Sequence, residues 1–427
     1  MTWTPVNELP FGRDMVVKQF RLHNGLTLLL CTDDAAPIFS YQTWFRVGSA
    51  FEQPGRTGMA HLFEHLMFNQ TESLPAGEFD RLIESAGGDT NAATWVDWTY
   101  YRTSLPAREL DLAVRLETDR MQRLALDDEQ LEAERDVVIN ERMMRVDDDV
   151  EGFLDEQLMK LAFERHPYQW PTIGWMKDIQ ALAKPDVHAF YRTYYAPNNA
   201  TVVLVGDVGE QRALAALEAG YGDIAPADVP PPPRVEEPVQ IGERIARFKK
   251  PVPADRLLVA YRAPAQSHAD WPVLDLISSL LTGGPSARLY KRLVVETQVC
   301  SSCDGYVLPF RDPSLFELSF TLTRGNDAAE VITEVNDAAA RLCDVPVSQA
   351  ELTKVKNGAE TDFWGPLASC DGRAEALGHY HTTLGDYRLL FRALDELRRV
   401  DAGDVMRAAH RYLDSGQRTI VVAEPQA

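Results

Sequence analysis

The chain contains the stretch Gly58-Met59-Ala60-His61-Leu62-Phe63-Glu64-His65-Leu66-Met67-Phe68, from which the other predictions follow. It is largely apolar and has no helix breaker after Gly58, so it predicts a short helix. His61 and His65 are four residues apart, just over one helical turn, so both imidazoles leave the same face and can bind one metal ion. Glu64 follows His61 by three residues, close enough to that face to reach a water molecule at the metal.

The order His-x-x-Glu-His is the reverse of the His-Glu-x-x-His motif of many zinc enzymes. A catalytic zinc ion held by two histidines needs a third protein ligand and an open position for water. An acidic helix predicted over 127–145 offers Glu134 and Glu141, which lie two turns apart on one face. This helix is the predicted source of the third ligand.

The same residues carry a family resemblance. The motif at 61–65, followed after a long gap by Glu134 and then by Glu141 in a Val-Val-x-x-Glu-Arg context, is similar to the pitrilysin/insulinase family of zinc peptidases. That family includes the mitochondrial processing peptidases and many short bacterial relatives. Further segments lie where the family places such sequences: Asn24–Thr27, Gly48–Ala50, Pro75–Phe79, Gly87–Ala92 and Tyr195–Ala200. The resemblance covers the whole chain, most strongly up to about residue 225.

The resemblance implies a role for each residue of the site. His61, His65 and Glu141 are the expected ligands of one zinc ion per chain, as in other His-His-Glu catalytic sites. Glu64 is the expected general base, which takes a proton from water and passes it to the leaving amine. Glu134 is expected beside the site, orienting a ligand or the base. Its alternative is an ordinary solvated helix glutamate.

The resemblance also implies a substrate-binding strand. Asn91, Ala92 and Ala93 begin a strand that in the family flanks the zinc and pairs with an extended peptide. We expect the backbone, rather than a side chain such as Thr94, to make these contacts. A plain core strand is the alternative.

One feature departs from the family. Members that act alone carry an Arg and a Tyr, seven residues apart in the second half, that bind substrate and stabilise the oxyanion. Val294 and Ser301 align with these positions, while Arg288 and Tyr290 lie out of register and are expected to be structural. The chain is also half the length of the one-chain forms. We therefore expect a heterodimer with a homologous subunit that supplies the Arg and the Tyr. A homodimer is the alternative.

The composition is that of an ordinary globular protein. The 427 residues are 45% hydrophobic and 25% charged, and their number predicts two domains. A net charge of −21 argues against nucleic acid or an anionic membrane as partner. The acidity favours solubility and, more weakly, basic peptide substrates. The sequence contains no run of 18 apolar residues, so it predicts no membrane span.

The cysteines and the amino terminus say little about the compartment. Five cysteines (Cys31, Cys300, Cys303, Cys343 and Cys370) are too scattered for a disulfide framework. Cys300-Ser-Ser-Cys303 is expected to be a pair of packed thiols in a strand, and a redox or metal pair is the alternative. The first residues lack the features of a signal peptide. We expect a periplasmic location if a signal peptide has been removed, and a cytoplasmic one otherwise.

Hydrophobic patterning and turn residues predict the remaining organisation. Strands are predicted over 20–31 (a hairpin around Asn24-Gly25), 38–47, 91–104, 200–206, 256–262, 299–307 and 315–323, and helices over 76–86, 109–124, 186–194 and 271–281. Four consecutive prolines, Pro230–Pro233, predict an extended spacer. The predicted division is an N-terminal zinc-binding domain (1–225), a linker (226–240) and a related C-terminal domain without a metal site (241–427).

These expectations combine into one fold and one function. The fold class is α+β, with two related domains, each an antiparallel sheet with helices packed on one face. The predicted function is a zinc metalloendopeptidase or oligopeptidase that cleaves short or unfolded peptides in a chamber. Two alternatives stay open: a non-catalytic scaffold or assembly subunit, which usually lacks the motif, and a specific precursor-processing protease. A glycine-rich recognition loop would favour the latter, and the second half shows none.

Overall fold

The computed structural model describes residues 3–12 and 15–426. They form two compact units, and each unit is built from separate segments of the chain. Unit 1 comprises Met1–Arg142, Trp170–Arg234 and Gly365–Leu390; unit 2 comprises Met143–Gln169, Val235–Trp364 and Phe391–Ala427. None of the described helices is long and apolar enough to cross a membrane.

Unit 1 is built on a seven-stranded sheet with the order β1-β2-β3-β7-β4-β6-β5. The strands are β1 (Trp3–Phe11), β2 (Met15–Leu22), β3 (Thr27–Thr32), β4 (Ile38–Phe45), β5 (Asp89–Thr94), β6 (Thr99–Pro106) and β7 (Ala200–Gly206). The central strand β7 is buried along its whole length, as expected for a β-branched run between two strands. The hairpin from β2 to β3 turns at Asn24-Gly25, where Gly25 takes a φ of +94° that suits glycine.

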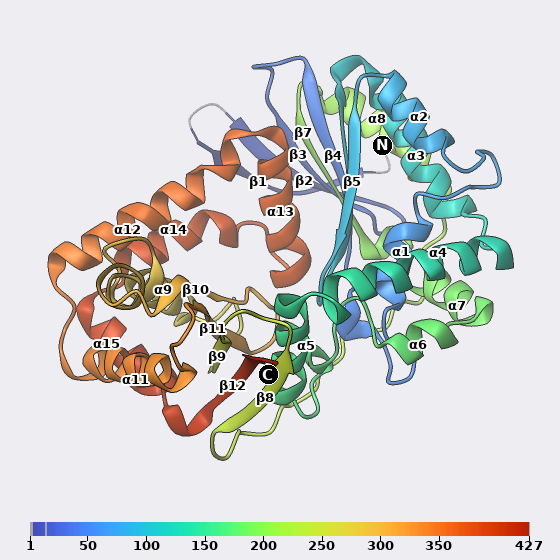
Figure 1. The fold of residues 1–427 in the computed structure, drawn as a ribbon. Helices are drawn as coiled ribbons and strands as arrows, with labels where there is room; N and C mark the ends of the chain where they lie inside the picture. Colours follow the sequence, from blue (N-terminus) through green and yellow to red (C-terminus); the bar gives the residue numbers. More distant parts are fainter. Residues whose placement is uncertain (1–2, 13–14, 427) are drawn as a thin grey trace. The chain divides into compact units, whose positions relative to one another are not determined.

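Helices cover both faces of this sheet. The α-helices of unit 1 are α1 (Met59–Leu66), α2 (Glu78–Ser85), α3 (Leu110–Arg123), α4 (Asp128–Arg142), α6 (Met176–Ala181), α7 (Lys184–Tyr194), α8 (Glu210–Tyr221) and α13 (Cys370–Leu384). Helix α13 packs on β4 and β7, on the side of the sheet opposite to α2 and α3 (Figure 1). Helix α1 packs beside β5 and β6, near the end of the strand order.

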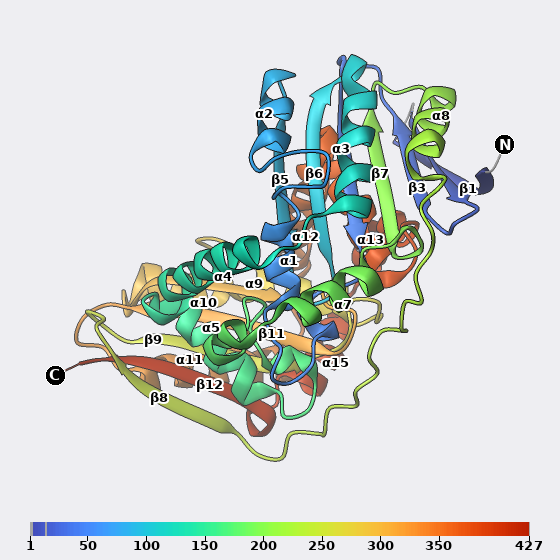
Figure 2. The ribbon, with the colours of Figure 1, turned by 90° about the vertical axis from the view of Figure 1, so that its right-hand side faces the viewer.

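Unit 2 has a five-stranded sheet with the order β10-β11-β9-β12-β8. Its elements are β8 (Arg244–Lys250), β9 (Arg256–Ala263), β10 (Cys300–Val307), β11 (Ser314–Leu322), β12 (Arg418–Pro425), α5 (Val150–Ala162), α9 (Trp271–Thr282), α10 (Arg288–Tyr290), α11 (Ala328–Asp344), α12 (Gln349–Trp364), α14 (Leu389–Arg399, beginning in unit 1) and α15 (Ala402–Tyr412). Residues 224–241, which precede this sheet, contain no helix or strand (Figure 2).

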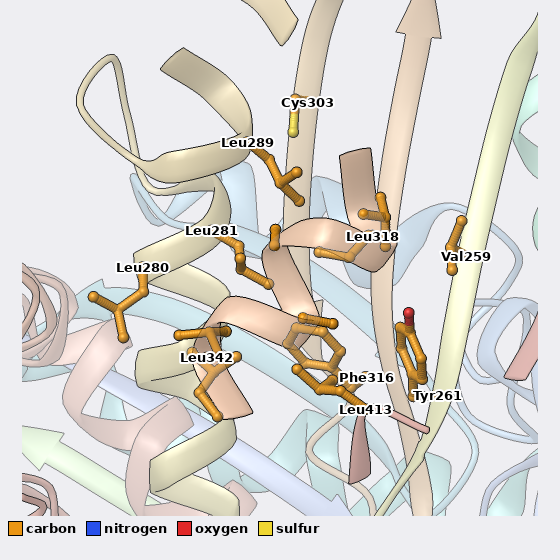
Figure 3. Packing of buried hydrophobic residues seen from close by; sticks show 14 of the residues in the cluster. Val259, Tyr261, Leu280, Leu281, Leu289, Cys303, Phe316, Leu318, Leu342 and Leu413 are labelled. Carbon is orange, nitrogen blue, oxygen red and sulfur yellow. The ribbon is translucent and has the colours of Figure 1, made fainter. Parts of the chain in front are cut away.

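The core of unit 2 lies between its sheet and its helices (Figure 3). Leu281, Phe316 and Leu342 come from two helices and a strand and pack together in one cluster. Cys303 belongs to the same cluster, and burial raises the pKa of its thiol and raises that of Cys300 to about 12. Both thiols are free and buried, as expected of packed strand residues rather than a reactive pair.

The α+β class with two sheet-and-helix units is confirmed, but the prediction of helices on one face of each sheet is wrong for unit 1, where α13 covers the face opposite to α2 and α3 (Figure 1). Three other details also differ from the prediction. First, each sheet contains one parallel pair, β3 with β7 and β8 with β12. Second, the single strand predicted over 91–104 is wrong. The chain reverses there in a tight turn in which the Trp95 N–H donates to the Trp98 carbonyl, so β5 and β6 form a hairpin.

Third, the compact units do not follow the predicted linear division into 1–225, 226–240 and 241–427. One unit boundary, Arg234 to Val235, does fall inside the predicted linker. However, α5 from the first half packs on β8, β9 and β12, and α13 from the second half packs on β4 and β7. Each half of the chain therefore gives one helix to the other half's sheet, which linear patterning cannot reveal.

Candidate metal centre

The position of α1 depends on a glycine at its start. Gly58 takes a φ of +88°, and a Cβ there would lie 2.6 Å from the Ile173 carbonyl oxygen. A side chain at this position would therefore push the helix away from the segment it packs on. Farther along, the Phe63 ring stacks on Tyr191 and lies tilted against Tyr195, which keeps the opposite face of α1 in the core. The two histidines are thereby turned toward α4.

The structure brings His61, His65 and Glu141 together. Glu141 Oε2 lies 3.6 Å from His61 Nε2 and 3.2 Å from His65 Nε2. One donor atom from each of the three residues lies within 4.8 Å of the other two. All three side chains are at least three-quarters buried. Contacts between α1 and α4 set this geometry.

This donor set fits a zinc ion. Two imidazole nitrogens and one carboxylate oxygen are the ligands of a common class of catalytic zinc site, which keeps one position open. Ligand atoms on a tetrahedral ion about 2.0–2.1 Å away lie roughly 3.3–3.5 Å from one another, close to the spacing found here. The three residues could therefore hold a zinc ion with little rearrangement.

Glu134 lies on the other side of the His65 ring. Its Oε2 is 3.5 Å from His65 Nδ1, and its Oε1 accepts a 2.8 Å hydrogen bond from Asn69 Nδ2. Burial lowers the pKa of His65, but the contacts with Glu134 and Glu141 outweigh it and raise the pKa to about 9. The two carboxylates thus create a place that favours positive charge. Glu134 therefore lies beside His65, as expected, and its role in orienting a ligand or the base stays a prediction.

Asn69 was not identified from the sequence. It follows α1 by three residues, and its partner Glu134 lies 65 residues further along the chain. No local pattern in the sequence therefore indicates this contact. The hydrogen bond of Asn69 goes to Glu134 Oε1, the carboxylate oxygen other than the one beside His65. Such outer partners of a metal-binding histidine fix the ring orientation and the tautomer.

Glu64 is half-buried on α1, between the two histidines in sequence. Burial raises the pKa of Tyr100 on β6 to about 12, and the Glu64 carboxylate adds to that shift, which places its charge near this strand. The sequence-predicted base therefore shares its helix with the two histidines, and that helix packs beside β5 and β6.

The predicted substrate strand is β5, which stands at the end of the strand order. Asn91 and Ala93 pair with Arg102 and Tyr100 of β6. In an antiparallel ladder hydrogen-bonded and non-hydrogen-bonded pairs alternate. Because Trp95 bonds to Trp98, the N–H and C=O groups of Ala92 point away from β6. No described strand pairs with that edge of β5.

The unit 2 residues at and near the positions of the family's Arg and Tyr make contacts within that unit. Arg288 Nε donates to Glu351 Oε1 at 3.1 Å, and Tyr290 and Val294 pack against the core cluster. Ser301 is exposed on β10 and donates to the Thr321 carbonyl. The expectation that Arg288 and Tyr290 are structural agrees with these contacts.

The structure thus has two sheet-and-helix units and, in unit 1, a His-His-Glu cluster that could hold a metal ion, and comparison with known proteins identifies the family. Residues 29–174 match the model of "Insulinase (Peptidase family M16)", and residues 181–359 match that of "Peptidase M16 inactive domain". The chain belongs to peptidase family M16.

Relatives resemble this chain over nearly their whole length. The zinc protease PqqE of Helicobacter pylori is 32% identical over 414 residues, covering 95% of this chain and 92% of its own. The beta subunit of the mitochondrial-processing peptidase of Blastocladiella emersonii is 24% identical, with 95% and 88% covered. A crystal structure of a protease from Helicobacter pylori matches with a TM-score of 0.92 and 30% identity, covering 96% and 99% of the two chains.

Proposed function

We propose that this chain is a zinc peptidase that hydrolyses short or unfolded peptides, with one zinc ion held by His61, His65 and Glu141. The observation that carries the proposal is the convergence of these three side chains within 4.8 Å, although they come from two helices, α1 (Met59–Leu66) and α4 (Asp128–Arg142), that are far apart in sequence. The zinc proteases among the relatives support the same class of reaction.

The residues of the site divide the chemistry between them. A zinc ion held by these residues would polarise the scissile carbonyl and lower the pKa of bound water. Glu64 accepts the proton of the attacking water and then donates it to the amine nitrogen as the C–N bond breaks and the new C–O bond remains. Glu134, held by Asn69, keeps His65 in the tautomer with its proton on Nδ1. The lone pair of Nε2, the nitrogen beside Glu141, is then free for the metal.

Substrate binding is proposed at the open edge of β5. A peptide that pairs with the outward groups of Ala92 gains main-chain hydrogen bonds that any sequence can make. Such pairing selects for extended backbone and only weakly for side chains. Asn91 and Ala93 contribute by holding β5 on β6 through their ladder partners.

We further propose that a homologous subunit completes the site. The chain carries Val294 and Ser301 where the family's Arg and Tyr are expected, and one relative is named as the beta subunit of a processing peptidase. The heterodimer is preferred over the homodimer because the latter lacks both side chains. The periplasmic location stays a prediction.

The test is peptide hydrolysis by the zinc-loaded chain on a quenched fluorogenic peptide, alone and after mixing with its homologous partner. Hydrolysis that is abolished in H61A and by a chelator supports the proposal. Tight zinc binding without hydrolysis in any mixture would instead favour a partner-specific processing protease. Failure to bind zinc stoichiometrically would favour the scaffold alternative, to which the match with an inactive domain over 181–359 gives some weight.

A further inference from the structure

The amino end of α1 is capped by a residue outside the helix. Gly58 occupies the N-cap position and has no side chain to accept from the first-turn N–H groups. Glu52, six residues upstream, supplies the acceptors. Gly58 N donates to Glu52 Oε2 at 2.8 Å, and Ala60 N donates to Glu52 Oε1 at 2.7 Å. Both carboxyl oxygens are therefore used, and Glu52 is only 5% exposed.

The protonation of Glu52 does not remove this cap. Burial raises its pKa to about 8, while hydrogen bonds from the Ala60, Gly58 and Met59 N–H groups act in the opposite direction. In either state both oxygens can accept, because a hydroxyl oxygen retains acceptor capacity. A glutamine would differ, since its amide places an N–H donor where an acceptor is needed.

The segment that carries Glu52 is itself tied to the β5–β6 hairpin. Ser49 N donates to the Trp95 carbonyl at 3.1 Å, and Ala50 N donates to the Val96 carbonyl at 2.8 Å. A Cβ at Gly48 would lie 2.2 Å from the Trp95 carbonyl oxygen, so the two backbones touch. Glu52 therefore connects the tip of the proposed substrate-binding hairpin to the helix that carries the two histidines.

A second set of bonds joins α1 to α4 through the loop at 173–175. Thr57 Oγ1 donates to Asp178 Oδ2 at 2.8 Å and accepts from Trp175 N at 2.9 Å. Arg142, the neighbour of Glu141, donates from Nη1 to the Gly174 carbonyl at 2.8 Å. This loop contacts both ligand-bearing helices on their buried side. Glu52 is a separate contact that fixes α1, and it acts at the end nearest His61.

We infer that Glu52 is a positioning residue of the metal centre: by holding the first turn of α1 against the β5–β6 hairpin, it sets the geometry of His61 and His65 toward Glu141. The inference rests on the proposed zinc site. An eight-residue helix has only two turns, so a shift of its first turn is transmitted directly to both histidines. The alternative is that Glu52 contributes to the stability of unit 1 and to nothing else.

The variants are E52Q, which replaces one acceptor by a donor, and E52D, which keeps both acceptors on a side chain shorter by one methylene. The matched control is D33N. Asp33 is a partly buried carboxylate of the same unit that pairs with Arg373 and contacts neither α1 nor α4. Three measurements are made on each protein: the zinc dissociation constant by chelator competition, the visible spectrum of the cobalt-substituted protein, and the thermal midpoint of the metal-free protein.

E52Q should weaken zinc binding by about tenfold or more, in the range of outer-partner effects on metal affinity, and should change the cobalt spectrum. E52D should recover part of both. D33N should lower the thermal midpoint without changing zinc affinity or spectrum. If E52Q lowers the midpoint like D33N yet binds zinc with wild-type affinity and spectrum, Glu52 is only structural and the inference is wrong.

Two further results keep the test decisive. If E52Q does not fold, the test rests on E52D, whose shorter side chain weakens the hydrogen bonds from Gly58 and Ala60. A folded E52D with an unchanged cobalt spectrum would contradict the positioning role. If the wild-type chain binds no zinc, or H61A binds it equally well, the proposed metal site has failed rather than the role of Glu52.

Discussion

Replacing Glu134 by glutamine should weaken zinc binding without disturbing α4. The carboxylate lies 3.5 Å from His65 Nδ1, and at an effective dielectric constant of about 20 a full charge pair at that distance is worth at most about 5 kcal/mol. Both side chains are roughly one-fifth exposed, so water screens part of this. Measured effects of such partners are about 10- to 100-fold in metal affinity, or about 1.4–2.8 kcal/mol.

The substitution is selective because glutamine keeps one of the two contacts. Its carbonyl can still accept from Asn69, whereas its amide can donate to His65 Nδ1. That donation favours the tautomer with the proton on Nε2, the atom that faces Glu141 and would bind the metal. We therefore expect the affinity loss of E134Q to fall within the upper part of this range, and that of E134A, which leaves both tautomers of His65 accessible, to be smaller.

The assay is competition with a chromophoric chelator at fixed pH, and the control is E132Q. Glu132 lies on the exposed side of the same helix, and its replacement by glutamine removes the same charge. E132Q should bind zinc as the wild type does. Equal zinc dissociation constants for E134Q and E132Q would refute the argument that Glu134 orients His65.

Three further predictions address catalysis, substrate pairing and pH. E64Q should keep zinc affinity within about twofold while kcat falls by a factor of about 100 or more, and retained turnover would contradict the role of Glu64 as base. A92P removes an N–H that points away from β6, so kcat/KM should fall about tenfold at unchanged zinc affinity; unchanged kcat/KM would exclude pairing at this edge. Burial raises the pKa of Glu317 to about 8 and that of Asp155 to about 6, so the folded state binds protons more tightly than the unfolded state and stability should fall as pH rises from about 4 to 8. E317Q should therefore have a higher thermal midpoint than the wild type at pH 8 and a similar one at pH 4, and a higher midpoint at neither pH would contradict the buried-carboxylate argument.

Local patterns predicted the elements that carry their own signals. The helix with His61 and His65, the buried strand 200–206 and the Asn24-Gly25 hairpin all depend on residues close in sequence, and the structure contains each of them. The pairing of the histidines with Glu141 was also predictable, because two-turn spacing and the family resemblance pointed to one helix. These features need no knowledge of the tertiary fold.

The features that were missed depend on strand pairing, helix packing and individual hydrogen bonds, which side-chain patterns do not show. The turn at 95–98 lies in an aromatic run that resembles a continuous strand, and only pairing with β6 shows the reversal. The exchange of α5 and α13 between sheets is a property of packing, since either helix could cover either sheet. Glu52 and Asn69 are ordinary polar residues whose roles come from partners 6 to 65 residues away.

All three candidate metal ligands lie in unit 1, so metal binding can be tested separately from catalysis. His61, His65, Glu141 and the residues that hold them all lie in unit 1, on helices anchored by bonds within that unit. Zinc binding should therefore need no partner, even if peptide hydrolysis needs one to supply Arg and Tyr. We expect the isolated chain to have the same zinc dissociation constant before and after mixing with a homologous subunit, measured at equal free zinc. A constant that falls more than about tenfold on mixing would show that the partner completes the metal site itself, and the Arg/Tyr explanation of a shared site would then be insufficient.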